Sequence, residues 1–419
     1  FVEIGYPRPS GRIGGAGTYV NNFAKELVKL GHKVTVICGK MENDVLSFKD
    51  GDIIVYPIIS PNRISYYMGK IPYFRVFSNT MNYLINGFKI YLLLNKLNSK
   101  DKIDLIEYSE GGDFWNSITK KFRYFSHLHG SSYTFKNNSN QQINKSDLLQ
   151  RKLEHYFIKN AEKVISPCMA MVKIVETEMM KKLNAFIIPY PIEKKYFDKL
   201  RHNDHRPSKS KVFILFASRN DPVKGCDLFI NSLEKIINRL KSVIEVDIFG
   251  YIPIKDVSHL EFLHVNRFVP KSELNLAYKK ADICVIPSLF DNSPNTVYEA
   301  MASGKIVVAS AVGGIPEIMG ESENGYLFTK SDVDDLTLKL SQAIDLVLTG
   351  NDSILRKNMI NIFSYQVEID TSGAGYFFQA LLHKSGNQAY ENIREYIHYA
   401  PTDIRGRIFY SNLYWSNFL

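Results

Sequence analysis

The chain has 419 residues, of which 45% are hydrophobic and 23% charged, and its net charge is +9 at pH 7. These values are typical of a globular protein, and the length exceeds what one hydrophobic core usually organises, so two domains are expected. Apolar runs stay short of the about 18 residues that a membrane-spanning helix needs, and no signal peptide is expected. The four separated cysteines have neither zinc-site nor disulfide-framework spacing, which predicts buried free thiols in a reducing cytoplasm.

The positive charge is concentrated in the N-terminal half. Residues 1–200 contain 29 lysines and arginines against 18 acids, whereas the remaining residues contain 23 against 25. A basic half indicates an anionic partner, such as a phospholipid surface or a lipid-phosphate acceptor, or alternatively a solvated surface rich in lysine. Nucleic acid is not expected, because the chain shows no zinc-finger, RNA-recognition or basic-zipper pattern.

Short apolar runs alternate with amphipathic helical patterns, which is typical of parallel α/β architecture. The first series predicts a helix over residues 17–30, ended by Gly31, and strands over residues 1–4, 34–38, 53–56, 105–108, 124–129, 164–166 and 186–189. Residues 62–97 mix basic, aromatic and aliphatic residues at near-helical spacing. They are interpreted as a helix pair that packs on the core or, alternatively, as a surface for a membrane or a lipid-linked acceptor.

Residues 194–211 are polar and lack a period, which predicts an interdomain linker. A second series follows, with predicted helices over residues 225–240, 271–280, 296–303 and 332–348 and predicted strands over residues 212–217, 244–249, 263–265, 283–287 and 305–309. The fold class is therefore predicted as α/β, with two Rossmann-like, doubly wound domains that face a central cleft. Ligands of such sheets bind outside the carboxyl ends of the strands, so the cleft is the expected site.

The strongest motif is the run DICVIPSLFDNSPNTVYEAM at 282–301. An apolar strand is followed by a loop with Asp291 and by a helix that begins near Asn295 and Thr296, with Glu299 one turn inside. Helix N-termini offer unpaired N–H groups and a positive dipole end, so this loop can hold a phosphate or sugar hydroxyls. Glu299 can accept two hydrogen bonds from a ribose diol, or it can be a charge that the helix end stabilises.

The second motif is FASRNDPVKGCDLF at 216–229. Arg219 and Lys224 stand five positions apart in a loop that follows a strand and opens a helix at Gly225. Two cations at a strand end can clamp a diphosphate, the guanidinium through two oxygens and the ammonium as a point charge. The alternative is a pair of exposed bases in a solvated loop.

Two weaker motifs lie in the first series. In PSGRIGGAGTYVNNFAKEL, Gly14 and Gly15 let the backbone approach a ligand, although the dinucleotide spacing G-x-G-x-x-G is not met. A strand ends at His129, which can meet a ligand or be a structural histidine. The acidic pairs at 50/52, 245/247 and 332/334 lie in a turn, within a strand and at a helix start, so no metal site is predicted.

Together these motifs resemble the family 4 retaining glycosyltransferases of the GT-B fold. That family carries two acidic residues separated by seven, most often with glutamate first, where this chain has Asp291 and Glu299. It also carries an Arg-x4-Lys-Gly arrangement before that pair. The resemblance implies that Glu299 binds the donor ribose, that Asp291 and His129 lie beside the transferred sugar, and that Arg219 and Lys224 hold the diphosphate.

The resemblance also implies contacts for the remaining site residues. N–H groups near Asn295 and Thr296 meet the donor, the glycine-rich loop with Gly14 and Gly15 touches donor and acceptor, and the base stacks near Tyr251 and Phe268. Glu107 and Glu110 are weaker candidates for the acceptor. The expected division is an acceptor-binding domain over residues 1–193, a nucleotide-sugar-binding domain over 194–370, and aromatic-rich C-terminal helices over 371–419 that cross back to the first domain.

The implied activity is metal-independent, retaining transfer, with no cofactor, from a UDP-sugar or GDP-sugar to a hydroxyl of a glycan, lipid-linked or small-molecule acceptor. It would serve bacterial polysaccharide, glycan or glycolipid biosynthesis in the cytoplasm. The positive charge of the N-terminal half separately predicts peripheral membrane contact through that domain. Two alternatives stay open: a sugar-nucleotide epimerase of the same fold, and a non-catalytic partner protein with a glycosyltransferase fold.

Overall fold

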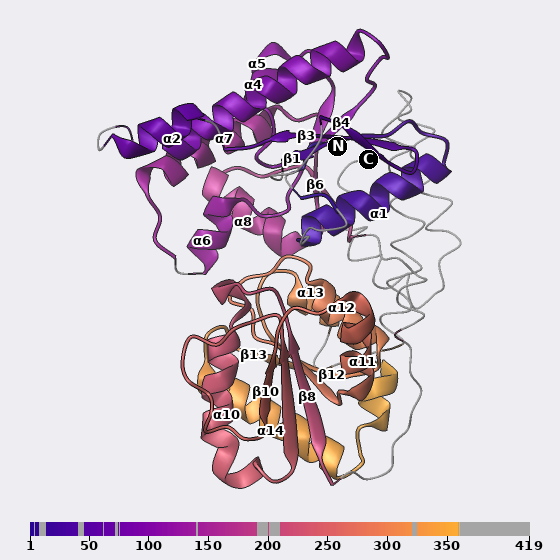
Figure 1. The fold of residues 1–419 in the computed structure, drawn as a ribbon, viewed down its shortest axis with the longest axis vertical. Coiled ribbons are helices and arrows are strands. Elements are labelled where there is room, and N and C mark those ends of the chain that lie inside the picture. The colour runs from indigo at the N-terminus through magenta and orange to yellow at the C-terminus, as the bar shows by residue number, and fades with distance from the viewer. Residues whose placement is uncertain are drawn as a thin grey trace.

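The computed structural model describes residues 1–3, 5–7, 14–40, 46–61, 63–71, 74, 76–139, 141–190, 200, 210–320, 325–358 and 360. These residues form an N-terminal body, residues 1–190, and a C-terminal body, residues 210–358 (Figure 1). Both predicted domain boundaries, nearly all of the predicted linker and the whole predicted C-terminal segment lie outside the described residues. None of the helices within the described ranges is long and apolar enough to cross a bilayer.

The sheet of the N-terminal body has two parts, which the first residues of the chain join. Val2 forms β-bridges with Ile37 in one part and with Tyr108 in the other. The strands run in the order β1-β3-β2 and β4-β5-β6-β7, with bounds β1 Thr35–Gly39, β2 Phe48–Asp50, β3 Ile53–Ile59, β4 Ile106–Ser109, β5 Tyr124–His127, β6 Lys163–Ser166 and β7 Ala185–Ile187. The run predicted as a strand over 1–4 therefore contributes bridges at Val2, and Ile4 lies outside the described residues.

One strand departs from the predicted parallel pattern. β2 pairs antiparallel with β3, with Asp50 opposite Ile53. The two-residue connection places Gly51 at φ +59°, a left-handed conformation that glycine adopts without strain. The Asp-Gly-Asp run predicted as a turn is thus the turn of a hairpin.

The helices of the N-terminal body cover both faces of its sheet. α1 buries Tyr19, Phe23 and Leu27 in a core cluster of this body, and Gly31 (φ +86°) follows its C-terminus, where a terminating glycine was predicted. The bounds are α1 Gly15–Lys29, α2 Arg63–Lys70, α4 Ser78–Asn98, α5 Phe114–Thr119, α6 Ser132–Asn138, α7 Lys145–Asn160 and α8 Met169–Met179.

The C-terminal body is a doubly wound parallel sheet. Its strand order is β10-β9-β8-β11-β12-β13, with bounds β8 Val212–Ala217, β9 Ile244–Phe249, β10 Leu263–Asn266, β11 Ile283–Ile286, β12 Ile306–Ser310 and β13 Tyr326–Phe328. β9 and β10 are added on one side of β8, and β11, β12 and β13 are then added on its other side, so the strand order reverses between β8 and β11. A crevice at the carboxyl ends of these two strands is where such sheets bind ligands.

Helices on the two faces of this sheet form separate core clusters. One cluster contains residues of α10 and α14, and the other contains residues of α11, α12 and α13. The bounds are α10 Cys226–Leu240, α11 Lys271–Lys280, α12 Asn295–Ala302, α13 Ile315–Met319 and α14 Val333–Leu348, with a short 3-10 helix η1 at Pro222–Lys224. All four cysteines are free and buried, as predicted.

The two bodies touch through hydrogen bonds and apolar side chains. The Asn292 side chain donates to the carbonyl oxygen of His129 (2.6 Å). The Glu317 carboxylate accepts from the N–H groups of Met169 (2.8 Å) and Ala170 (2.7 Å), at the start of α8. The Phe290 ring lies edge-on to the Phe135 ring, with 5.2 Å between centroids. The bodies therefore face each other at close range, with α8 at their boundary (Figure 1).

Candidate functional site

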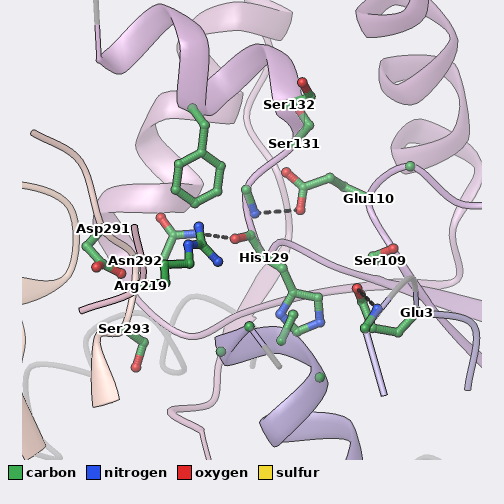
Figure 2. A pocket seen from close by; sticks show the side chains of 18 of the residues that line it. Glu3, Ser109, Glu110, His129, Ser131, Ser132, Arg219, Asp291, Asn292 and Ser293 are labelled. Atoms are coloured by element: carbon green, nitrogen blue, oxygen red, sulfur yellow. Dashed lines mark hydrogen bonds between the residues drawn. The ribbon is translucent and has the colours of Figure 1, made fainter. Parts of the chain in front are cut away.

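A cavity of about 740 Å³ lies between the two bodies, at the carboxyl ends of β8 and β11. Figure 2 shows the Asn292 side chain of the C-terminal body beside the His129 backbone of the N-terminal body, with Arg219 and Asp291 on the same side as Asn292. Eight of the eleven predicted site residues line it: Gly14, Gly15, His129, Arg219, Lys224, Asp291, Asn295 and Thr296. The cavity therefore lies where the cleft was predicted, and residues of both bodies line it.

The loop after β8 carries both predicted cations. The Arg219 guanidinium donates to Asp221 Oδ2 (2.9 Å from Nη2), and the Asp221 side chain also accepts from the N–H of Val223 at the start of η1. Lys224 Nζ donates to Asp291 Oδ2 (2.5 Å), which ties this loop to the one after β11. Each cation is thus held by a carboxylate at the cavity.

The position after Lys224 explains why this motif requires glycine. Gly225 has φ +70°, and a Cβ placed there would lie 1.9 Å from the carbonyl oxygen of Pro287 at the end of β11. Any side chain would push the two loops apart. The glycine therefore allows the cation-bearing loop to lie directly against the loop that carries Asp291.

A second pair of glycines supports Asp291 from the other side. A Cβ at Gly313 would lie 1.8 Å from the carbonyl oxygen of Asp291, and a Cβ at Gly314 would lie 1.9 Å from that of Asn292. The Gly314 N–H also donates to the carbonyl oxygen of Asp291 (3.1 Å). The small-residue run after β12 is thus what allows close packing under the loop.

The start of α12 presents polar groups to the cavity. Asn292 Oδ1 and Ser293 Oγ are buried and have no hydrogen-bond partner among the described residues, and both residues line the cavity. In this part of the chain no side chain caps α12, whose first residues are Asn295 and Thr296. A helix N-terminus with unmet N–H groups is suited to a phosphate or another anion.

Three predicted contacts do not line the cavity. Glu299 is buried one turn inside α12, where its Oε2 accepts from the hydroxyl of Tyr278 (2.9 Å). Tyr251 is 1% exposed, packs edge-on to Phe216, and donates its hydroxyl to Asp227 (3.0 Å). Phe268 is 60% exposed. The ring of Tyr251 is therefore covered by its own core, while that of Phe268 lies open to solvent.

His129 belongs to a buried polar cluster beneath the cavity. Its Nδ1 lies 2.6 Å from the hydroxyl of Tyr190, and its ring stacks on that of His127 with 4.1 Å between centroids. His127 Nδ1 in turn lies 3.0 Å from Glu107 Oε1. Burial holds the pKa of His129 well below its ordinary value, with a further lowering from His127, so this imidazole is neutral at pH 7.

Glu107, His127 and His129 form a group of ligand atoms within 4.8 Å of one another, which a metal ion could in principle use. The two imidazole rings are nearly parallel, at 16°. Imidazole nitrogens bind metals in the plane of the ring, so an ion between stacked rings would lie out of both planes. The geometry instead favours a network of hydrogen bonds that orients His129.

Glu110, one of the two weaker candidates for the acceptor, lies in the wall of the cavity. It follows the last residue of β4, is 2% exposed and lines the cavity. Its Oε2 accepts from the N–H of Gly130 (2.8 Å), while Oε1 has no partner among the described residues. Burial raises the pKa of Glu110 to about 8. Its position directly after a strand is the same signal that pointed to His129.

Comparisons with known proteins agree with this architecture. The sequence model described as Glycosyltransferase Family 4 matches residues 13–193, and that described as Glycosyl transferases group 1 matches residues 211–345. An uncharacterized glycosyltransferase of Methanocaldococcus jannaschii is 24% identical over 358 residues, which cover 83% of this chain and 88% of that protein.

Two further proteins are similar over different lengths. The MMP alpha-(1->4)-mannosyltransferase of Mycolicibacterium hassiacum is 26% identical over 196 residues, so the match spans 43% of this chain and less than half, 45%, of that relative. Among solved structures, a sucrose-phosphate synthase from Thermosynechococcus elongatus superposes with a TM-score of 0.70 at 18% identity, covering 92% of this chain and 99% of the other. At that identity the likeness concerns the fold.

Proposed function

Because this chain belongs to the family 4 glycosyltransferases, whose fold is GT-B, we propose that it is a retaining enzyme that transfers a sugar from a nucleotide-diphosphate sugar to a hydroxyl group of an acceptor. The observation that supports this most is the convergence of Arg219, Lys224 and Asp291 on one cavity, where the strand order of the C-terminal sheet reverses. Ligands of open α/β sheets bind at such a point.

In this proposal the donor binds mainly to the C-terminal body. Its diphosphate accepts hydrogen bonds from Arg219 and Lys224. These bonds form in addition to the present ion pairs with Asp221 and Asp291 or replace them. N–H groups at the start of α12 contribute at the same place. Glu299 does not line the cavity, but it remains our candidate for the ribose because it lies one turn inside α12, whose first residues line the cavity.

In this proposal the positive charges of Arg219 and Lys224 promote transfer of the sugar. As the bond between the anomeric carbon and the phosphate oxygen breaks, negative charge grows on the leaving phosphate, where the two cations stabilise it. The acceptor oxygen forms the new bond from the same face and gives its proton to that phosphate oxygen. The two side chains supply the charge that a divalent ion would otherwise supply, so the proposal includes metal independence.

The acceptor binds to the N-terminal wall of the cavity. That wall includes the neutral imidazole of His129 and the carboxyl group of Glu110, whose buried Oε1 has no hydrogen-bond partner among the described residues. In this proposal the acceptor is a glycan, a lipid-linked sugar or a small molecule, and the protein acts in polysaccharide, glycan or glycolipid assembly in the cytoplasm. The nucleotide of the donor is either UDP or GDP in this proposal.

Nucleotide binding is the first test. Thermal unfolding is measured with UDP, GDP and ADP and with the matching monophosphates, since a ligand at 100 times its Kd adds about 2.7 kcal/mol to the free energy of unfolding. One of the diphosphates should raise Tm more than its monophosphate, and Arg219→Ala should reduce the difference. Equal shifts for diphosphate and monophosphate would remove the basis of the assignment.

Transfer assays separate the remaining alternatives. The sugar form of the selected nucleotide is incubated with candidate acceptors, with and without EDTA, and the anomeric configuration of the product is read by NMR. An α-linked product from an α-linked donor, undiminished by EDTA, is expected. A free epimerised sugar without acceptor would indicate an epimerase, and nucleotide binding without turnover would indicate a non-catalytic partner.

A further inference from the structure

A surface of exposed apolar side chains lies on α2 and on the described residues between α2 and α4. We call it the α2 face. Its members are each between 45% and 61% exposed: Ile64, Tyr66, Tyr67, Ile71, Phe74 and Phe77. Along α2 the buried residue is Ser65, so most of this short helix points to solvent. Figure 1 shows α2 at the outer end of the N-terminal body.

The chain segment that carries this face has charge of one sign. Between Asp52 and Asp101 the sequence contains no aspartate or glutamate, and it contains six basic residues: Arg63, Lys70, Arg75, Lys89, Lys96 and Lys100. Arg63 and Lys70 begin and end α2. Lys70 Nζ lies 4.5 Å from the centroid of the Tyr66 ring, so a cation and an aromatic ring share one patch.

Exposed aromatic rings beside cations are suited to the surface of a lipid bilayer. At a bilayer surface, tyrosine and phenylalanine rings insert at the level of the headgroups, while lysine and arginine remain near the lipid phosphates. A protein partner or a second copy would have to supply a matching acidic and apolar surface. We propose that the α2 face docks the protein peripherally on a bilayer that contains anionic phospholipids.

The position of the face gives this docking a consequence. The Ser65 hydroxyl lies 3.5 Å from Asn82 Oδ1 on α4, and Asn82 lines the cavity between the bodies. The bilayer would therefore lie about one helix diameter, about 10 Å, from the N-terminal wall of that cavity. Where the proposed transfer activity holds, a lipid-linked acceptor can reach the wall without leaving the membrane. The docking itself does not depend on that activity.

The test is sedimentation of the full chain with vesicles of phosphatidylcholine alone and with vesicles in which phosphatidylglycerol replaces part of it. The test variant is Tyr66→Ser/Tyr67→Ser/Phe74→Ser. The matched control changes three side chains of the C-terminal body that are at least as exposed: Ile254→Ser/Leu276→Ser/Ile354→Ser. The parent and the control should bind the anionic vesicles equally, and the test variant at least about tenfold more weakly.

Lys70→Glu is a second variant that leaves the aromatic side chains in place. It should weaken binding to anionic vesicles about fivefold or more, because a basic residue near such a surface contributes about that factor. Added salt should weaken binding of the parent. All variants are first matched to the parent in Tm and in the Tm shift with nucleotide diphosphate, so that a folding defect is not mistaken for lost docking.

Three outcomes would overturn the proposal. They are no binding of the parent to anionic vesicles, equal binding of the test variant and the control, and a concentration-dependent dimer that the test variant loses, which would make the face an interface between copies. No readout uses sugar transfer. Failure of docking therefore leaves the transfer activity untouched, and failure of transfer leaves the docking result valid.

Discussion

Replacing Lys224 by alanine removes the ammonium group that pairs with Asp291. Nζ lies 2.5 Å from Oδ2, and the two side chains are 21% and 11% exposed, so solvent screens this site only in part. Two unit charges about 4 Å apart interact by about 4 kcal/mol at an effective dielectric constant of about 20. Only part of a charge develops on the leaving phosphate, so we expect about 3 kcal/mol of lost transition-state stabilisation, or about 100-fold in kcat.

The assay is release of nucleotide diphosphate under saturating donor and acceptor, with Tm measured on the same sample. Lys235→Ala is the matched control, because Lys235 forms an ion pair with Asp334 on the surface of the same body. The control should retain normal turnover. A Lys224→Ala enzyme with near-normal kcat, or one whose loss is fully explained by unfolding, would refute the reasoning.

Three further changes test other parts of the site. Glu299→Gln should weaken diphosphate binding about tenfold in a titration, since a charged acceptor of hydrogen bonds is lost; an unchanged Kd would argue against a ribose contact. Gly225→Ala should lower the free energy of unfolding by about 2–4 kcal/mol in denaturant titrations, because residue 225 has a positive φ and the added Cβ would lie 1.9 Å from the Pro287 carbonyl oxygen. A variant as stable as the parent would contradict the close packing described. Burial raises the pKa values of Glu107 and Glu110 to about 8 from 4.5, so the folded chain holds protons that the unfolded chain has released, and their contribution to stability should fall as the pH rises from about 4.5 toward 8. Burial lowers the pKa values of His127 and His129 from 6.5, which offsets this fall below about pH 6.5, so the net loss of stability should appear between about pH 6.5 and 8. Glu110→Gln should remove part of this slope above pH 6.5, up to about 1.4 kcal/mol per pH unit, and an unchanged dependence of Tm on pH would be inconsistent with a raised pKa.

The regular elements of the fold could be predicted because their hydrophobic patterns are strong. The strand over 212–217 and the helix over 271–280 have the bounds that their periodicity predicted. β2 and β13, of three residues each, were not predicted, since so short a segment has no measurable period and depends on its neighbour for pairing. β7 is equally short, but it overlaps the longer apolar run that predicted a strand over residues 186–189. Val2 shows the same limit, because its bridges depend on chain segments far away in the sequence.

Within the site, the predictable residues are those that the topology places. Arg219 and Asp291 follow the two strands between which the strand order reverses, and this position can be recognised from the order of strand and loop. Burial of individual rings could not be predicted in the same way. Tyr251 lies in the core and Phe268 in solvent because side-chain packing between distant segments decides which ring is covered. For Glu110 the position after β4 could be predicted, but the contact of its carboxyl group with the Gly130 N–H depends on tertiary packing.

The contact of Glu317 with α8 has a consequence for motion. α8 has no cap from its own N-cap residue, Cys168, and the Glu317 carboxylate binds its first two N–H groups from the other body. A capping interaction of this kind contributes about 1 kcal/mol to a helix end. Separation of the bodies would leave the first turn of α8 open to fraying, so hinge movement and local helix stability are thermodynamically linked through one glutamate.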